Sequence, residues 1–151
     1  MIESRPYEDL DLDFFRELIA SSPAWQKEEC LPEQALEYMF SYKMYNGKWQ
    51  IWSCNNEAIG ISFHISWSPS NEKPWLGTVL VKEEQRSKGY GKEVVSRISA
   101  DLKKAGHKAV FAGCPADKLE WLKFLASCGF EQLKLERDAG GKEYMITVKP
   151  A

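Results

Sequence analysis

The spacing of hydrophobic residues in the first third of the chain predicts one strand followed by two helices. Residues 2–6 alternate in character and end at Pro6, which is typical of a short first strand. Hydrophobic residues then recur at helical spacing after an acidic first turn, at Leu12, Phe15, Leu18 and Ile19. A second helix is expected to begin near Pro32, a residue suited to a first helical turn. It should bury Ala35, Leu36, Met39 and Phe40.

The next segments predict a hairpin and then a buried strand. Residues 47–54 and 57–68 flank a polar turn with the sequence NNE. In the second segment, Ile59, Ile61, Phe63, Ile65 and Trp67 alternate with Gly60, Ser62, His64 and Ser66. This alternation predicts one core face and one polar face. Residues 74–81 are almost continuously apolar, which is typical of a strand covered on both faces.

A glycine-containing segment follows that strand and leads into a helix. The helix is expected to end at Gly106, a suitable C-terminal cap. Its hydrophobic face should consist of Val94, Val95, Ile98 and Leu102. Residues 107–114 then predict another strand.

The C-terminal part predicts one more helix and a pair of strands. The helix should begin with a capping box of Asp117 and Glu120, lie buried between layers, and end at Gly129. Residues 130–137 and 142–149 read as antiparallel strands around a tight turn. The predicted order is therefore one strand, two helices, three strands, a helix, a strand, a helix and two strands, with no repeat and no linker.

Composition and charge narrow the class of protein. A chain of 151 residues with 44% hydrophobic residues is expected to form a single domain, residues 1–151. The net charge of −2 lacks the basic excess expected of a nucleic-acid binder. We also expect no membrane span and no signal peptide, and hence a cytoplasmic protein.

Cysteine and histidine usage argues against a metal site. The four cysteines form no C-x-x-C pair, and reduced thiols are expected. Neither histidine, His64 or His107, stands at a metal-ligand spacing from a cysteine. We therefore expect no metal.

The segment QRSKGYGKEVV, residues 85–95, predicts an anion site at the start of a helix. The first amides of a helix lack internal partners and carry the positive end of the dipole. Gly89 and Gly91 lack a Cβ, and Arg86, Lys88 and Lys92 add positive charge. The alternative is a tight turn with solvated basic residues. The nucleoside-triphosphate loop motif is absent, and the dinucleotide motif is incomplete because Val94 stands where a third glycine is needed.

Within its context, the glycine segment resembles the acetyl-coenzyme A signature R/Q-x-x-G-x-G/A of the GNAT superfamily of N-acetyltransferases. The matching residues are Arg86-Ser87-Lys88-Gly89-Tyr90-Gly91, and FLASCGFEQ near the end is similar to the family's FY-x-x-x-GF segment. The resemblance covers nearly the whole chain. It implies an α/β (α+β) GNAT fold, with a mixed, mostly antiparallel sheet of about six to seven strands flanked by about four helices.

The resemblance also implies which residues bind the acetyl-CoA cosubstrate. The backbone of Val79, Leu80 and Val81 would pair with the pantetheine arm. The pyrophosphate would be held by the backbone amides of Arg86, Ser87, Lys88, Gly89, Tyr90, Gly91 and Lys92. The backbone amide of Val81 or Leu80 would polarise the thioester carbonyl.

Two positions depart from the family pattern. Leu125 stands where many relatives have a tyrosine that protonates the leaving thiolate. Trp75 stands where some relatives have a glutamate base. His64 and Glu72 are the candidate substitutes, His64 because an imidazole can accept a proton near neutral pH. The alternative for His64 is an ordinary surface or hydrogen-bonded strand histidine.

The resemblance places the acceptor pocket in the first half of the chain. Trp25, Tyr38 and Tyr42 could line it, unless they serve only as packing. The sequence therefore indicates an N-acetyltransferase that acts on a primary amine of a small molecule or peptide by direct attack in a ternary complex. The alternative is a weak or inactive acyl-CoA sensor. The acceptor's identity, the acyl-chain preference and the oligomeric state, a homodimer included, stay open.

Overall fold

The computed structural model describes residues 2–151 as two compact units joined within two strands and within one helix. Unit 1 contains residues 2–64 and Thr78–Val94, and unit 2 contains Ile65–Gly77 and Val95–Ala151. The chain passes between the units at the end of β3 (Glu57–Ile65), inside β4 (Trp75–Val81) and inside α4 (Tyr90–Lys104). That residues 1–151 form a single domain stays a prediction.

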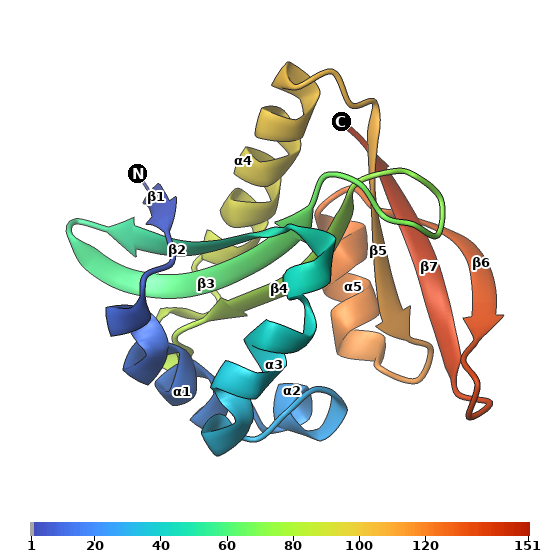
Figure 1. Ribbon diagram of the computed structural model, residues 1–151. Helices are drawn as coiled ribbons and strands as arrows, with labels where there is room; N and C mark the ends of the chain where they lie inside the picture. The colour runs from blue at the N-terminus through green and yellow to red at the C-terminus, as the bar shows by residue number, and fades with distance from the viewer. Residues whose placement is uncertain (1) are drawn as a thin grey trace. The chain divides into compact units, whose positions relative to one another are not determined.

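Across the described residues the strands follow the order β1-β2-β3-β4-β5-β7-β6 in a seven-stranded sheet (Figure 1). The strands are β1 (Ile2–Pro6), β2 (Lys48–Cys54), β3 (Glu57–Ile65), β4, β5 (Ala109–Pro115), β6 (Glu131–Arg137) and β7 (Glu143–Pro150). The α-helices are α1 (Leu12–Ala20), α2 (Pro23–Glu28), α3 (Ala35–Ser41), α4 and α5 (Leu119–Ser127). The β4–β5 pairing is parallel, whereas β1–β2, β2–β3, β5–β7 and β6–β7 are antiparallel, so the mixed, mostly antiparallel α/β prediction is confirmed for this part of the chain.

In unit 1 the predicted hairpin of β2 and β3 is confirmed, but the predicted polar face of β3 is wrong. Asn55 and Asn56 turn the chain with φ of 51° and 65°, values that asparagine tolerates well. Ser62 and His64 are both buried, and the Nε1–H of Trp52 on β2 donates to Ser62 Oγ at 2.8 Å. Both faces of β3 therefore belong to the interior.

Helices α1 to α3 differ from the expected pair of helices. The hydrophobic face of α1 is confirmed by three buried residues, Phe15, Leu18 and Ile19. Helix α2 was not predicted. The second predicted helix does start near Pro32, with a 3-10 turn before α3, but Leu36 and Phe40 are 47% and 61% exposed. Ring contacts of Tyr38 and Tyr42 anchor α3 instead.

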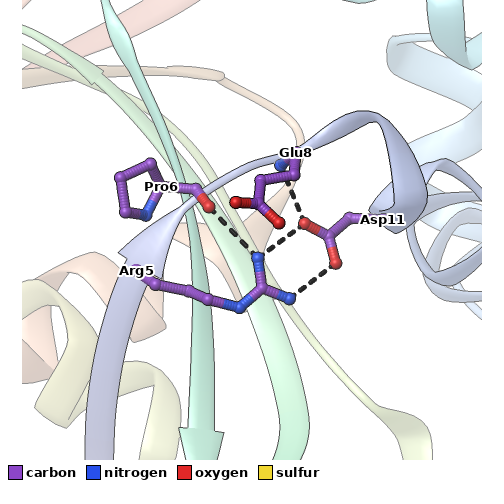
Figure 2. A network of polar contacts seen from close by, with 4 residues as sticks. All are labelled: Arg5, Pro6, Glu8 and Asp11. Atoms are coloured by element: carbon purple, nitrogen blue, oxygen red, sulfur yellow. Dashed lines mark hydrogen bonds and ion pairs between the residues drawn. The ribbon is translucent and has the colours of Figure 1, made fainter.

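An ion pair fixes the chain between β1 and α1 (Figure 2). The two terminal nitrogens of Arg5 donate to the two carboxylate oxygens of Asp11, each at 2.7 Å. Asp11 also accepts the backbone N–H of Glu8 at 2.8 Å. The hydrogen bonds from Arg5 lower the pKa of Asp11, so its carboxylate stays charged at neutral pH.

In unit 2, β5 pairs with β7 and β7 pairs with β6, both antiparallel. The predicted strands 107–114, 130–137 and 142–149 are thus confirmed with small shifts of their ends. The glycine cap of α4 is also confirmed, because Gly106 has a φ of 97°.

Helix α5 begins and packs differently from the prediction. Its first flanking residue is Lys118, and no side chain caps it, so the expected capping box of Asp117 and Glu120 is wrong. Leu119 is 65% exposed, and only Leu125 of the helix is buried. The expectation of a helix buried between layers is therefore also wrong. Gly129 does follow the helix, with a φ of 96°.

Candidate functional site

The glycine segment in unit 1 forms an exposed loop that ends in the first turn of α4. A 3-10 turn, Glu83–Gln85, follows β4, and Ser87 and Gly89 then take the left-handed φ values of 64° and 84°. A Cβ at Gly89 would meet nothing within 4 Å. Helix α4 starts at the next residue, and the Gly89 carbonyl accepts the N–H of Glu93 at 3.0 Å.

This geometry places the first backbone N–H groups of α4 directly after an exposed loop. Tyr90, Gly91 and Lys92 occupy the first turn, where backbone N–H groups have no partner inside the helix. Gly91 lies in the helix, so the left-handed turn of the loop belongs to Ser87 and Gly89. The positive end of a 15-residue helix faces the same place. The arrangement can hold an anion through the backbone.

The basic residues of the loop have different environments. Lys88 is exposed, and its Nζ donates to Gln85 Oε1 at 3.2 Å. Lys92 is exposed in the first helical turn. The guanidinium of Arg86, in contrast, contacts the Val81 carbonyl and the Ser22 hydroxyl of its own chain. The loop therefore contains two exposed lysines and one arginine that is held by hydrogen bonds within the chain.

Strand β4 approaches β3 closely just before the loop. A Cβ at Gly60 would lie 2.6 Å from the Leu80 carbonyl oxygen, and the Lys82 N–H donates to the Ile59 carbonyl at 2.7 Å. Leu80 and Lys82 thus direct their backbone groups toward β3. Because successive residues of a strand alternate, the backbone groups of Val79 and Val81 point to the opposite edge.

Tyr90 links the first turn of α4 to the end of β2. Its hydroxyl donates to Cys54 Sγ at 3.6 Å. This hydrogen bond raises the pKa of the Tyr90 phenol. The phenol therefore stays protonated near neutral pH.

The three aromatic residues predicted to bind the acceptor lie together in unit 1. The Trp25 ring packs edge-on against Tyr38 at 5.3 Å, and Tyr38 packs against Tyr42 at 5.1 Å. These contacts belong to an aromatic cluster of Phe15, Trp25, Tyr38, Tyr42, Trp49 and Phe63. Trp25 is buried, whereas Tyr38 and Tyr42 are half-buried. Tyr38, Tyr42 and Trp49 are the members that combine ring packing with partial exposure.

Tyr38 also carries the polar contacts of this cluster. Its hydroxyl donates to Glu29 Oε2 at 3.2 Å. Burial, with a further contribution from the Glu29 charge, raises the pKa of Tyr38 far above its ordinary value. Tyr38 is therefore a neutral hydrogen-bonding group beside the Glu29 carboxylate.

The two candidate bases lie in different units. His64 is on β3 in unit 1, opposite Lys48 of β2, and is 5% exposed. Glu72 is exposed in the loop before β4 in unit 2 and has a φ of 59°. Its backbone N–H donates to the Ser68 carbonyl at 2.7 Å.

Trp75 and Leu125, the two positions that depart from the family pattern, lie in unit 2, and their side chains are packed against other residues. Trp75 stacks on Phe111 with ring centroids 5.5 Å apart, and its Nε1–H donates to Asn71. Leu125 is buried in α5. Neither side chain carries a proton that acid–base catalysis at neutral pH could use.

Sequence reasoning missed Gly60 and Ser22. Gly60 was considered only as a polar-face residue, although an isolated glycine inside a strand often marks a close backbone approach. Ser22 precedes Pro23, a pair that could have predicted the start of α2. Its contact with Arg86, 64 positions away, has no local signal.

Two further kinds of feature, a metal-binding cluster and a membrane-spanning helix, are absent from residues 2–151. Within that range no group of three or more His, Cys, Asp or Glu residues could hold a metal ion. No helix in the same range has the length and apolar character that a membrane crossing requires.

The family model of the GNAT acetyltransferases matches residues 9–130. The chain belongs to the GNAT acetyltransferase family. The match includes both the glycine loop and the helix that contains Leu125. It agrees with the resemblance inferred from the sequence, and the resemblance is confirmed.

Several known proteins are similar to this chain in sequence or in fold. The uncharacterized protein YkzC of Bacillus subtilis strain 168 is 48% identical over 133 residues, which are 88% of this chain and 93% of that protein. A protein from Desulfovibrio desulfuricans assigned to the GNAT family has a TM-score of 0.81, 16% identity and 99% coverage of both chains. A Bacillus subtilis acetyltransferase solved in complex with CoA has a TM-score of 0.74 and 15% identity, covering 100% of this chain and 99% of that one. At these identities the two solved structures establish the fold.

Proposed function

We propose that this member of the GNAT family is an N-acetyltransferase that uses acetyl-CoA. It transfers the acetyl group to a primary amine of a small molecule or peptide by direct attack in a ternary complex. The observation that carries the proposal is the loop into α4, where Gly89 has a φ of 84° and open space at its Cβ position. The CoA-bound Bacillus subtilis structure of the same fold supports it.

The residues of unit 1 fit the diphosphate of acetyl-CoA. Backbone N–H groups of Gly89, Tyr90, Gly91 and Lys92 would hold it at the positive end of the α4 dipole, with Ser87 and Lys88 beside them. A Cβ at Gly89 would occupy that exposed position. Acetyl-CoA, when bound, supplies an activated thioester and a thiolate leaving group.

The edge of β4 favours Val81 over Leu80 as the group that polarises the thioester carbonyl. The Leu80 carbonyl faces Gly60 on β3, so the backbone of Leu80 is directed to the neighbouring strand. Val79 and Val81 are directed to the other edge, where an extended pantetheine arm could pair with them. The Val81 N–H would stabilise negative charge that develops on the carbonyl oxygen.

The acceptor would be held by Tyr38 and Tyr42, with Trp25 as the buried ring behind them. Glu29, which accepts the Tyr38 hydroxyl, adds a carboxylate that attracts an ammonium group. The attacking nitrogen must lose a proton, and His64 and Glu72 remain the candidate acceptors of that proton. The imidazole of His64 is the candidate within unit 1.

Leu125 favours a second candidate function. A buried leucine cannot protonate a thiolate, so this chain lacks the side chain that many relatives use. A protein with the cofactor loop but without that acid could bind acyl-CoA as a sensor and turn over slowly. Water as the proton source would reconcile Leu125 with full activity.

The test is release of free CoA from acetyl-CoA in the presence of a panel of primary amines. The proposed enzyme should give amine-dependent release and intersecting initial-rate plots, because both reactants must be bound together. Parallel plots would indicate an acetyl-enzyme and would contradict direct attack. Tight acetyl-CoA binding without release across the panel would favour the sensor.

A further inference from the structure

The guanidinium of Arg86 joins separate segments of unit 1. Its Nε donates to the Val81 carbonyl at 3.0 Å, at the end of β4. Its Nη1 donates to the Ser21 carbonyl at 3.2 Å, and its Nη2 donates to Ser22 Oγ at 2.7 Å. The Ser22 hydroxyl in turn donates to the Leu18 carbonyl at 2.7 Å. Arg86 thereby ties the end of β4 to the corner between α1 and α2.

These contacts use the guanidinium as a rigid fork and not as a mobile charge. All three of its nitrogens donate to the protein's own oxygens. A planar fork fixes the direction of each donor, whereas a lysine ammonium presents a single rotatable point charge. The exposed Lys88 of the same loop instead donates from its Nζ to the side chain of Gln85. The two cations of the loop are therefore suited to different tasks.

We propose that Arg86 is a positioning residue, which couples the α1–α2 corner to the edge of β4 that would hold the thioester. The proposal rests on the proposed function. The carbonyl that Arg86 binds belongs to Val81, the residue whose N–H is proposed to polarise the thioester carbonyl. The same guanidinium holds Ser22, three residues before Trp25 of the aromatic cluster. A displacement of the α1–α2 corner therefore shifts the end of β4, and a displacement of the end of β4 shifts the corner.

The coupling has a kinetic signature that differs from that of a phosphate ligand. A phosphate ligand contributes mainly to affinity for CoA, and a lysine in its place could still bind phosphate as a point charge. A positioning residue contributes to the alignment of the two reactants, where a displacement of about 1 Å can cost up to about 100-fold in rate. Loss of the Arg86 tie should therefore reduce kcat and acceptor kcat/KM while the CoA dissociation constant changes little.

The test compares Arg86→Lys, Arg86→Gln, Ser22→Ala and the double variant Arg86→Gln with Ser22→Ala. CoA affinity is measured by calorimetry, and kcat and acceptor KM by CoA release. Both Arg86 variants should lower acceptor kcat/KM about tenfold, with the CoA dissociation constant within about threefold of the original. Ser22→Ala should give part of the same loss, and the double variant should be no worse than Arg86→Gln, because the two side chains act through one contact.

Lys103→Gln, an exposed change in the last turn of α4, is the matched control and should leave all three quantities unchanged. Normal activity in Arg86→Lys, together with weakened CoA binding in Arg86→Gln, would overturn the proposal and make Arg86 a phosphate ligand. Strictly additive losses in the double variant would also overturn it.

Failure of the proposed function gives a different result. An unaltered protein that binds no acetyl-CoA contradicts the proposed function itself. The contact between Arg86 and Ser22 is then tested by hydrogen exchange, which needs no ligand. The Gln26 N–H, bonded to the Ser22 carbonyl, should lose protection in Arg86→Lys, and unchanged protection would show that no such tie exists in solution.

Discussion

The loop from Lys82 to Lys92 and the aromatic cluster lie in the same unit, but they are built from different parts of the chain. The loop presents backbone: a left-handed glycine, exposed amides and lysines at the start of α4. The cluster presents rings that pack edge to face, such as Trp25 on Tyr38. A backbone site depends on local sequence, whereas a side-chain site depends on which residues the fold leaves uncovered. The proposed cofactor side is therefore defined more sharply than the proposed acceptor side.

The largest expected effect is loss of CoA binding in Gly89→Glu. A carboxylate would enter the proposed diphosphate position, and the left-handed φ of 84° would strain any side chain. We expect affinity for CoA to fall by about 100-fold or more while the protein stays folded. Calorimetric titration and a melting curve measure the two quantities.

Gly106→Glu is the matched control for this change. Gly106 has a similar φ of 97° and also has open space at its Cβ position, but it lies at the C-terminal end of α4. The Gly106→Glu variant should lose a similar amount of stability and keep its affinity for CoA. Equal affinity for CoA in the folded Gly89→Glu and Gly106→Glu variants would contradict the assignment of the loop as the CoA site.

The next effect concerns the cluster, where Trp25→Ala should act on stability. Trp25 is buried between Phe15 and Tyr38, so its removal leaves a cavity. We expect the free energy of unfolding to fall by about 3 to 5 kcal/mol, measured by denaturant titration. Trp67→Ala, a change at a tryptophan that is 54% exposed, should cost far less. Equal costs at the two sites would show that Trp25 does not pack as described.

A smaller effect is expected from Gly60→Ala, which tests the backbone of β4. The new Cβ would lie 2.6 Å from the Leu80 carbonyl oxygen, so the strands must separate locally. Overpacking of this kind costs about 1 to 3 kcal/mol. CoA affinity should fall as well, since the shift moves Val81. Gly113→Ala, where the nearest atoms are at ordinary contact distances of 3.6 and 3.7 Å, should change neither quantity, and a reversed order would refute the close approach.

The smallest effect is expected at the ion pair of Arg5 and Asp11, which belongs to neither region. Asp11→Asn should lower stability by about 1 kcal/mol at neutral pH without changing CoA affinity. The native pKa of Asp11 is lowered by Arg5, so the contribution is present above its ordinary value of 3.8 and is lost as the pH falls through the native pKa. Stability measured against pH should converge with that of the variant in this acidic range. A constant difference at all pH values would exclude the ion pair as the cause.

The contrast between the regions explains what the sequence could predict. Gly89 before a run of helical spacing indicates a loop, a helix start and an anion site at once, because all three follow from local backbone requirements. The hairpin at Asn55 and Asn56 was predictable for the same reason, since both residues tolerate positive φ. The glycines after α4 and α5 likewise take the left-handed values expected of helix ends.

The remaining features depend on contacts between distant segments. Leu36 and Phe40 have the spacing of a buried face, but the ring contacts of Tyr38 and Tyr42 turn that face of α3 outward. Ser62 has the pattern of a surface residue, but the indole of Trp52 pairs with it in the interior. The tie from Arg86 to Ser22 spans 64 positions. Periodicity along the chain contains none of this information.

The measurement that tests the central claim most directly is a thermal-shift titration with acetyl-CoA, with CoA and ATP as controls. A ligand at 100 times its dissociation constant stabilises a folded protein by about 2.7 kcal/mol, which gives a clear rise in Tm. We expect a rise in Tm with acetyl-CoA and with CoA, and none with ATP. No rise with acetyl-CoA at high concentration, or an equal rise with ATP, would contradict the claim that this loop binds the acetyl donor.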